Sequence, residues 1–356
     1  MKINNFSAGP SKIPIEVLST IAEDINNYKD LGYSVLEISH RSKVFENIVN
    51  TAKKKLVDIL KIPDDYDIFF IQGGATFQNT FIPANKKSLS SNVSFLISGT
   101  WGRKTHEDFE TYFGKKISNF TLSDIGFQNI EKYTNNLDEE YLYLTSNETI
   151  EGIQIRDFDL FNNKKLIIDM SSDICSYEFD WTNLSYVYAG AQKNLGIPGV
   201  TICIVKKGFV EESDQTSYLN INNHISKNSS FNTPPTFSIY VLLKILDWVL
   251  DAGGINEIQK NNFKRASRIY DFLDLHNEHF NLVAPVDLRS YSNIVFDFKD
   301  SSKTEKFLND CIARGFIGLN GHRSVGGVRV SNYNSITDEM VSDFLNTLND
   351  FISLDK

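Results

Sequence analysis

The chain contains few cysteines and has no excess of positive charge. Among 356 residues only Cys175, Cys203 and Cys311 are cysteines, and their spacing matches neither a disulfide framework nor a zinc motif. Scattered cysteines of this kind are typical of small buried residues in a reducing compartment. The net charge of −9 argues against nucleic-acid binding, which needs a basic face to displace counterions from phosphates.

Long apolar runs are also missing. Residues 1–14 lack the basic start and apolar stretch of a signal peptide. No segment approaches the roughly 20 consecutive apolar residues that span a bilayer. We therefore expect a cytoplasmic protein with no membrane partner.

The overall composition is that of a globular protein. Hydrophobic residues make up 41% and charged residues 23% of the chain. Because 356 residues exceed what one hydrophobic core usually fills, we expect a large and a smaller domain with a cleft between them.

The order of apolar segments predicts an α/β fold with a mostly parallel central sheet and a smaller α+β C-terminal domain. Apolar residues recur at helical spacing in 15–28, 45–60, 237–250 and 255–276, and strand-length apolar runs occupy 67–71, 93–97, 141–144, 165–168, 185–188 and 200–205. The C-terminal part is predicted to contain strands at 292–298, 316–319 and 327–331 and helices at 302–314 and 337–354. We place the domain boundaries at 1–15, which joins the small domain, 16–262 and 263–356.

A single lysine follows one of the buried strands. The segment 186–194 reads Tyr-Val-Tyr-Ala-Gly-Ala-Gln-Lys-Asn, so small residues precede Lys193 and would let a flat ring approach. A lysine at the end of a buried strand is desolvated, which lowers its pKa and frees the amine to attack a carbonyl. Taken by itself, the same pattern also fits a surface lysine.

A carboxylate follows a second buried strand. Asp169 ends the run 166–169 and lies 24 residues before Lys193 in the sequence. Pyridoxal phosphate withdraws electrons only while its ring nitrogen stays protonated, and a buried carboxylate stabilises that charge. Lys193 and Asp169 therefore form complementary parts of one chemistry, although Asp169 could instead cap a helix.

A glycine turn follows the strand 67–71. The sequence Gln-Gly-Gly-Ala-Thr at 72–76 predicts a tight turn and a helix start, where free backbone N–H groups bind a phosphate. Neither G-x-G-x-x-G nor a P-loop is present, so a dinucleotide or nucleotide site is not indicated.

Cationic residues gather in two other places. His40 and Arg41 lie in an early loop, and His322, Arg323 and Arg329 lie near the C-terminus. The planar guanidinium matches carboxylates and phosphates, so these residues are candidates for an anionic substrate as well as for solvated surface.

Seven motifs together resemble the phosphoserine aminotransferases, a family of class V, fold-type I pyridoxal-phosphate enzymes. They occur in order over nearly the full length, at residues 6–10 (FSAGP), 38–41 (ISHR), 72–75 (QGGA), 147–152 (NETIEG), 189–194 (AGAQKN), 231–236 (FNTPPT) and 321–327 (GHRSVGG). The resemblance implies a homodimer with active sites at the subunit interface, and residues 16–262 as the cofactor-binding domain.

The resemblance also implies the role of each site residue. Lys193 would be the Schiff-base lysine, Asp169 would pair with the pyridinium, Trp101 would stack on the ring and Thr149 would contact the cofactor. The cofactor phosphate would be held by the residues Ala75, Thr76 and Gln192 and, from the second subunit, Asn232 and Thr233. His40, Arg41, His322, Arg323 and Arg329 would bind the substrate, and no metal is expected.

The implied reaction transfers an amino group between L-glutamate and 3-phosphohydroxypyruvate and gives O-phospho-L-serine and 2-oxoglutarate. The family serves serine biosynthesis and often pyridoxine biosynthesis. One departure concerns Thr76, because some members carry arginine at this position, which puts one contact to the substrate phosphate in doubt.

Three other functions compete with this interpretation. An aminotransferase for an unphosphorylated amino acid, such as serine with glyoxylate, would not need the His40-Arg41 and His322-Arg323 pairs. A nicotinamide-dependent oxidoreductase would need the missing glycine fingerprint. A non-catalytic relative would not need both Lys193 and Asp169.

Overall fold

The structure is a computed structural model that describes residues 3–211 and 215–353. The predicted end of the last helix at Leu354, and the outermost residues of the predicted segments 1–15 and 263–356, lie outside the described residues. Within the described residues no helix is both long and apolar enough to cross a membrane.

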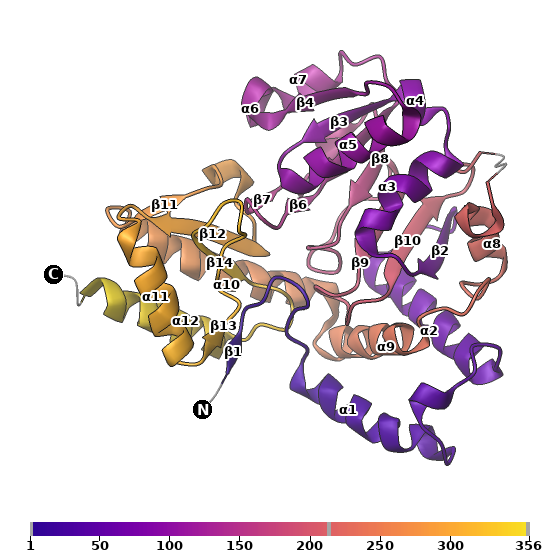
Figure 1. Cartoon of the computed structure of the whole chain (residues 1–356), viewed down its shortest axis with the longest axis horizontal. Coiled ribbons are helices and arrows are strands. Elements are labelled where there is room, and N and C mark those ends of the chain that lie inside the picture. The colour runs from indigo at the N-terminus through magenta and orange to yellow at the C-terminus, as the bar shows by residue number, and fades with distance from the viewer. Residues whose placement is uncertain (1–2, 212–214, 354–356) are drawn as a thin grey trace.

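A seven-stranded sheet forms the centre of the larger part of the molecule (Figure 1). Its strands lie in the order β2-β10-β9-β8-β5-β3-β4. Their bounds are β2 Tyr66–Ile71, β3 Val93–Ile97, β4 Ser118–Thr121, β5 Tyr141–Thr145, β8 Lys165–Asp169, β9 Leu184–Gly190 and β10 Thr201–Lys206. The strand β10 runs antiparallel to both of its neighbours, and the other pairs are parallel. The predicted mostly parallel sheet is therefore confirmed.

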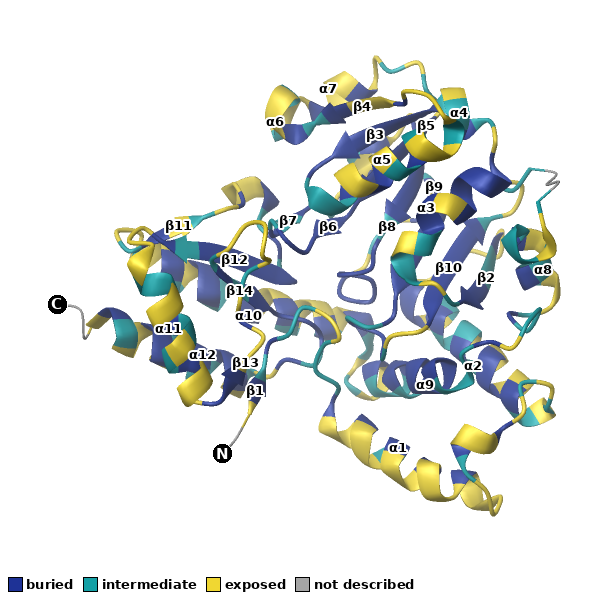
Figure 2. Ribbon diagram, in the orientation of Figure 1, coloured by how far each residue is buried: buried dark blue, intermediate teal, exposed yellow. Residues whose placement is uncertain are grey.

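Helices cover both faces of this sheet. Their bounds are α1 Ile15–Asn26, α2 Lys43–Leu60, α3 Gly74–Asn85, α4 Leu89–Asn92, α5 Thr100–Phe113, α6 Leu122–Ile125, α7 Ile130–Thr134, α8 Ile221–Ser226 and α9 Thr236–Asp251. Short 3-10 helices lie at Tyr28–Asp30, Val35–Glu37, Phe127–Asn129, Asp159–Phe161, Ser217–Leu219 and Val286–Leu288. The central strands are buried, whereas α1 is exposed along its outer side (Figure 2).

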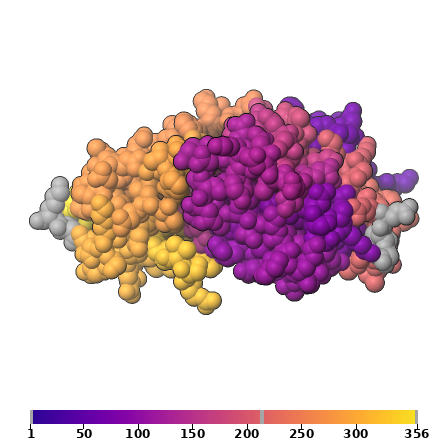
Figure 3. Space-filling view, turned by 90° about the horizontal axis from the view of Figure 1, so that it is seen from above, coloured from indigo at the N-terminus to yellow at the C-terminus, as the bar shows by residue number. Residues whose placement is uncertain are grey.

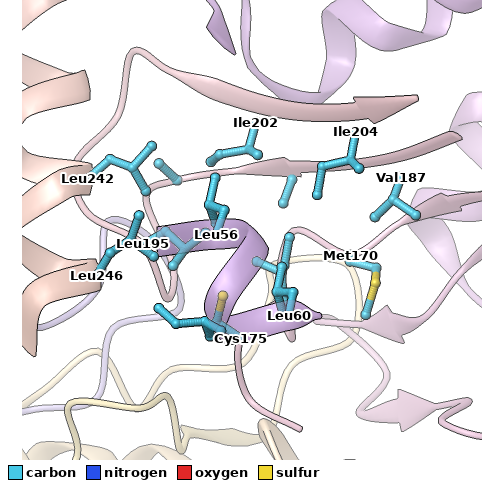
Figure 4. Close-up of a cluster of buried hydrophobic side chains, with 14 of the residues drawn as sticks. Leu56, Leu60, Met170, Cys175, Val187, Leu195, Ile202, Ile204, Leu242 and Leu246 are labelled. Carbon is cyan, nitrogen blue, oxygen red and sulfur yellow. The ribbon is translucent and has the colours of Figure 1, made fainter. Parts of the chain in front are cut away.

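Neighbouring residues of the central strands belong to different hydrophobic clusters, as expected for a sheet that is buried on both faces. In β10, Ile202 and Ile204 pack against α2 and α9, where Leu56, Leu242 and Leu246 meet them (Figure 4). Cys203 points to the other face. All three cysteines are buried and free.

The C-terminal part has a separate core. It contains α10 Gly254–Leu275, β11 Phe280–Leu282, β12 Asn293–Phe298, α11 Ser302–Ala313, β13 Phe316–Ile317, β14 Val328–Ser331 and α12 Asp338–Ser353. The strands β11, β12 and β14 form an antiparallel sheet. This α+β unit lies beside the larger part at one end of the elongated molecule (Figure 3).

The helix α10 joins the two parts. Ile255 and Ile258 near its start belong to the core of the large part, whereas Ala266 and Ile269 belong to the core of the C-terminal unit.

The N-terminal segment packs on the C-terminal unit. β1 Asn4–Asn5 pairs in parallel with β13, and Phe6 is buried against Phe316 and Phe344, at ring-centroid distances of 6.3 and 6.0 Å. The strand expected at 316–319 is therefore shorter than predicted and belongs to a separate two-stranded sheet.

Candidate active site

Lys193 lies just beyond the carboxyl end of β9 and is partly buried. Its Nζ donates a hydrogen bond to Thr149 Oγ1 at 2.6 Å. Burial lowers the pKa of the Lys193 amine from 10.5 to about 8, although the charges of Asp169 and Glu148 oppose this shift. A pKa near 8 leaves part of the amine unprotonated at neutral pH, and this is the nucleophilic form.

Asp169 is the last residue of β8, which is the parallel neighbour of β9. Burial raises the pKa of its carboxyl group, while hydrogen bonds from Ser171 and the charge of Lys193 act in the opposite direction. The Ser171 backbone N–H donates to Asp169 Oδ1 at 2.8 Å. Because the carboxyl ends of parallel strands meet at one edge of a sheet, Asp169 and Lys193 both line one cavity of about 190 Å³.

The start of α3 forms another wall of this cavity. Gly73 and Gly74 have positive φ angles of 111° and 69°. A Cβ on Gly73 would lie 2.7 Å from Phe77 Cβ, so the turn requires glycine at this position. The first backbone N–H groups of a helix have no partner within it, so Ala75 and Thr76 present an anion site to the cavity.

The remaining predicted cofactor residues fall into two groups. Trp101, Thr149 and Gln192 line the cavity, and the indole Nε1 of Trp101 is buried without a hydrogen-bond partner. Asn232 and Thr233 do not line it, and Thr233 is exposed.

Sequence reasoning did not identify several further residues of the cavity wall. These are Asn79, Lys104, Thr105, Thr145, Asn147, Ser171 and Ser172. Thr145 ends β5 in the way that Asp169 ends β8, so its place after a buried strand was the available signal.

The predicted substrate residues lie outside the cavity wall. Arg329 is the nearest to it, because its Nη1 donates to the backbone oxygen of Thr149 at 3.4 Å, and its Nε is buried without a partner. His322 and Arg323 are exposed on the loop before β14, where His322 Nδ1 lies 2.7 Å from Ser324 Oγ.

The early cationic loop lies beside the segment that carries Asn232. Arg41 is exposed, and its Nη1 donates to the backbone oxygen of Ser230 at 3.4 Å. His40, its neighbour, is partly buried. Arg41 therefore lies beside the segment that carries Asn232, and neither residue lines the cavity of Lys193.

Three larger hollows carry neither Lys193 nor Asp169. One, of about 430 Å³, is lined by Lys165 and Leu184 at the amino ends of β8 and β9. A second, of about 480 Å³, lies between the two parts and is lined by Arg156 and Tyr291. A third, of about 330 Å³, is lined by Leu60 and Phe179. Ligands of open α/β sheets bind at the carboxyl ends of the strands, so the smaller cavity is the candidate site.

Comparison with known proteins agrees with this geometry. Residues 3–344 match a protein family described as "Aminotransferase class-V". The chain belongs to this class V aminotransferase family. The predicted resemblance is thereby confirmed.

Individual relatives of this class V aminotransferase carry more specific names. A phosphoserine aminotransferase of Lysinibacillus sphaericus is 39% identical over 349 residues, which is 96% of each chain. The solved structure of phosphoserine aminotransferase from Bacillus circulans subsp. alkalophilus has a TM-score of 0.94 at 36% identity and covers 100% of this chain and 99% of its own. A pyridoxal-phosphate-bound phosphoserine aminotransferase from Trichomonas vaginalis has a TM-score of 0.90 at 30% identity, over 98% of this chain and 100% of its own.

The N-terminal segment of this class V aminotransferase contacts the loop of Lys193. The Ser11 backbone N–H donates to the Gln192 oxygen at 2.9 Å, and the Ser11 hydroxyl donates to the Lys193 oxygen. A Cβ on Gly9 would lie 3.5 Å from Lys193 Cγ. Residues 9–11 thus pack against the loop that carries Lys193.

Proposed function

We propose that the protein is a pyridoxal-phosphate-dependent phosphoserine aminotransferase. It transfers an amino group between L-glutamate and 3-phosphohydroxypyruvate, and O-phospho-L-serine and 2-oxoglutarate are the products. The observation that carries this proposal is the convergence of Lys193, Asp169, Trp101 and the start of α3 on one cavity.

The cavity fits the cofactor in three respects. The start of α3 offers unpaired N–H groups to a phosphate. The indole of Trp101 borders the space with a flat apolar surface, and Asp169 places a carboxylate opposite the amine of Lys193. When bound, pyridoxal phosphate supplies an electron sink for the bond that breaks at the substrate α-carbon.

Lys193 has two tasks in this proposal. Its amine would hold the cofactor, and as a free base it would accept the proton from the substrate α-carbon. The pKa of about 8 suits both tasks, because the amine can lose and regain a proton near neutral pH. Thr149 directs the amine through its hydrogen bond.

Asp169 keeps the heterocycle protonated. Its carboxylate is desolvated and points into the cavity beside Lys193. A negative charge in a site that excludes water stabilises a neighbouring positive charge far more than the same charge does in water. Ala75, Thr76 and Gln192 hold the phosphate end.

The active enzyme is a homodimer in this proposal, with Asn232 and Thr233 reaching the partner's cofactor phosphate. The contact between Arg41 and Ser230 supports the proposal that His40 and Arg41 also serve the partner's active site. An exposed apolar strip on and after α1, formed by Ile15, Leu18, Ile25, Leu31 and Leu36, offers a surface that a second copy could bury. Arg329, His322 and Arg323 complete the substrate site.

We further assign the protein to the cytoplasm and to serine biosynthesis, with a second role in pyridoxine biosynthesis. The buried free cysteines support a reducing compartment. The division of the two cores along α10 supports a domain boundary near residue 262, and the packing of Phe6 supports the assignment of 1–15 to the small domain.

A substrate panel tests the function. Purified protein is incubated with 2-oxoglutarate and either O-phospho-L-serine or L-serine as amino donor, and glutamate is measured. We expect phosphoserine to be preferred by at least about 100-fold in kcat/KM, because at least two charge-assisted contacts to the phosphate are lost with serine. Equal rates for the two donors would contradict the proposal.

The attachment of the cofactor is tested separately. Borohydride should bleach the yellow protein and fix the cofactor to Lys193, which peptide mass spectrometry identifies. A label on any other lysine would refute the assignment of Lys193.

A further inference from the structure

The first turn of α5 is held by side chains from another element. Its N-cap residue, Gly99, has no side chain that could accept from the helix. Instead Glu148 accepts from the backbone N–H groups of Trp101 at 3.0 Å and Gly102 at 2.8 Å. Glu151 accepts from the N–H of Thr100 at 3.0 Å. Two carboxylates therefore satisfy the N–H groups that a helix start leaves free, at the end where the helix dipole favours negative charge.

Glu148 and Glu151 pack closely against the backbone of the first turn of α5. Glu148 is fully buried. A Cβ on Gly99 would lie 2.5 Å from Glu151 Oε2 and 2.7 Å from Glu148 Cδ. A Cβ on Gly102 would lie 3.2 Å from Glu148 Oε1. The absence of side chains at these two positions is what lets the carboxylates reach the helix backbone.

The hairpin that carries Glu148 and Glu151 also contacts Lys193. It consists of β6 Asn147–Glu148 and β7 Ile153–Gln154, and Thr149 follows Glu148 directly. Thr149 Oγ1 accepts from Lys193 Nζ at 2.6 Å. One short segment thus fixes both the backbone of Trp101 and the amine of Lys193.

The indole of Trp101 depends on this backbone contact. Its Nε1 has no hydrogen-bond partner among the described residues. The Lys104 ammonium lies 5.7 Å from the ring centroid, but Lys104 is exposed and belongs to the same helix, so it cannot locate the ring relative to the sheet. The position of the ring therefore follows from where the first turn of α5 is held.

We propose that Glu148 is a positioning residue that fixes the Trp101 indole relative to Lys193, with Glu151 as a weaker second anchor. This inference rests on the proposed function for its consequence, which is the geometry of the cofactor ring against the indole. The hydrogen bonds themselves belong to the cofactor-free chain.

The substitution Glu148→Gln tests the geometry. Burial and the neighbouring Glu151 raise the pKa of Glu148 to about 8, against the effect of the two N–H donors. The site therefore accepts a neutral side chain of the same size at position 148. The glutamine amide, however, has a single acceptor oxygen, so its NH₂ group must face one of the two backbone donors.

The matched control is Glu107→Gln. Glu107 lies on the exposed side of the same helix α5, five residues beyond Gly102. This control removes one carboxylate from the helix without touching its first turn. Glu151→Gln is the intermediate variant, because one oxygen of Glu151 has no partner and the amide can keep the other as acceptor.

Two readouts are measured besides activity. In the cofactor-free protein, hydrogen exchange of the Trp101 and Gly102 amides should be about 10-fold faster in Glu148→Gln, as expected for the loss of one hydrogen bond. With cofactor added, its dissociation constant should rise by about 10-fold and its visible circular dichroism band should change. Glu151→Gln should show about a threefold change in exchange, and Glu107→Gln none.

The outcomes separate the two proposals. If the wild-type protein binds no cofactor, the proposed function fails, whereas the exchange measurement still tests the anchoring of α5. Unchanged exchange and unchanged cofactor affinity in a folded Glu148→Gln protein overturn the inference. A variant that only melts earlier, with a normal cofactor band, also overturns it, because a purely structural role has that signature. Should Glu148→Gln not fold, an unaltered exchange rate in Glu151→Gln overturns it.

Discussion

The two halves of the proposed site differ in how much of each a single chain assembles. The cofactor half, around Lys193 and Asp169, lies at the carboxyl ends of adjacent buried strands and encloses a cavity. The substrate half is spread over loops, with Arg41 and Arg323 exposed to solvent. In the proposed enzyme, one chain would therefore organise the covalent chemistry, whereas substrate recognition would depend on how two copies meet.

The reason is the nature of the supporting elements. A parallel sheet places the ends of its strands at one edge, whatever the loops contain. Loops such as 39–42 and 229–233 have no such constraint, and in the proposed dimer a partner would close the site around the exposed Arg41.

The largest effect is expected from Lys193→Ala. Loss of the amine removes both the covalent attachment and the base, so turnover should fall by at least about 10⁴-fold while weak cofactor binding remains. Steady-state assays and cofactor titration measure the two effects. A variant that retained near-normal turnover would remove Lys193 from the mechanism.

Asp169→Ala should have the next largest effect. We expect kcat to fall by about 10²–10³-fold and cofactor affinity to fall as well, because the ring loses its charge partner. Asp58→Ala, on the exposed side of α2, is the control and should leave both unchanged. Circular dichroism checks that the fold is intact, and an Asp169→Ala protein that behaved like the control would refute the role.

Arg41→Ala and Arg329→Ala sharpen the comparison between the halves. Each should raise KM for the dicarboxylate substrate by about 10–100-fold, the loss expected for one charge-assisted contact. Mixed dimers with Lys193→Ala chains separate their locations. If Arg41 serves the partner's site, the mixed dimer regains one complete site and about half the wild-type turnover.

Arg329 should behave differently in the same experiment. It contacts Thr149 of its own chain, so a mixed dimer of Arg329→Ala and Lys193→Ala chains contains no complete site and should keep the raised KM. Equal recovery in both mixtures would show that the two halves are not divided between chains as proposed.

The smallest effect concerns pH. The pKa of Lys193 falls from 10.5 to about 8 in the folded chain, so between these pH values the unfolded chain binds one proton more. The stability of the cofactor-free protein should therefore rise with pH across this window, and the gain is lost as pH falls towards 8. Lys193→Met should flatten this part of the profile in thermal denaturation, and an unchanged slope would contradict the shift.

The sequence was sufficient for elements whose pattern is local. The strands around residues 93–97 and 141–144 are continuously apolar, and they were predicted almost to the residue. The edge strand β4 was missed because Ser118 and Asn119 are polar and exposed. The helix α5 was missed as well, since its start at Thr100 is held by distant carboxylates instead of by a local cap.

The same distinction applies to the site. Lys193 and Asp169 could be found because each follows a buried strand, and motif resemblance supplied Trp101. The contacts of Glu148 could not be found in this way, because the 46 residues that separate it from Gly102 are brought together only by the packing of a hairpin against a helix. Hydrogen bonds of this range are a property of the folded chain.

Residues 4–11 contact both the C-terminal unit and the loop that carries Lys193. Asn4 pairs with Phe316, the Tyr333 hydroxyl donates to the Ala8 oxygen at 2.8 Å, and Ser11 contacts the lysine loop. Residues 4–8 can therefore dock only after residues 316–333 have been synthesised. Contacts between residues so distant in the sequence form slowly, so we expect the support of the lysine loop by Ser11 to form late in folding.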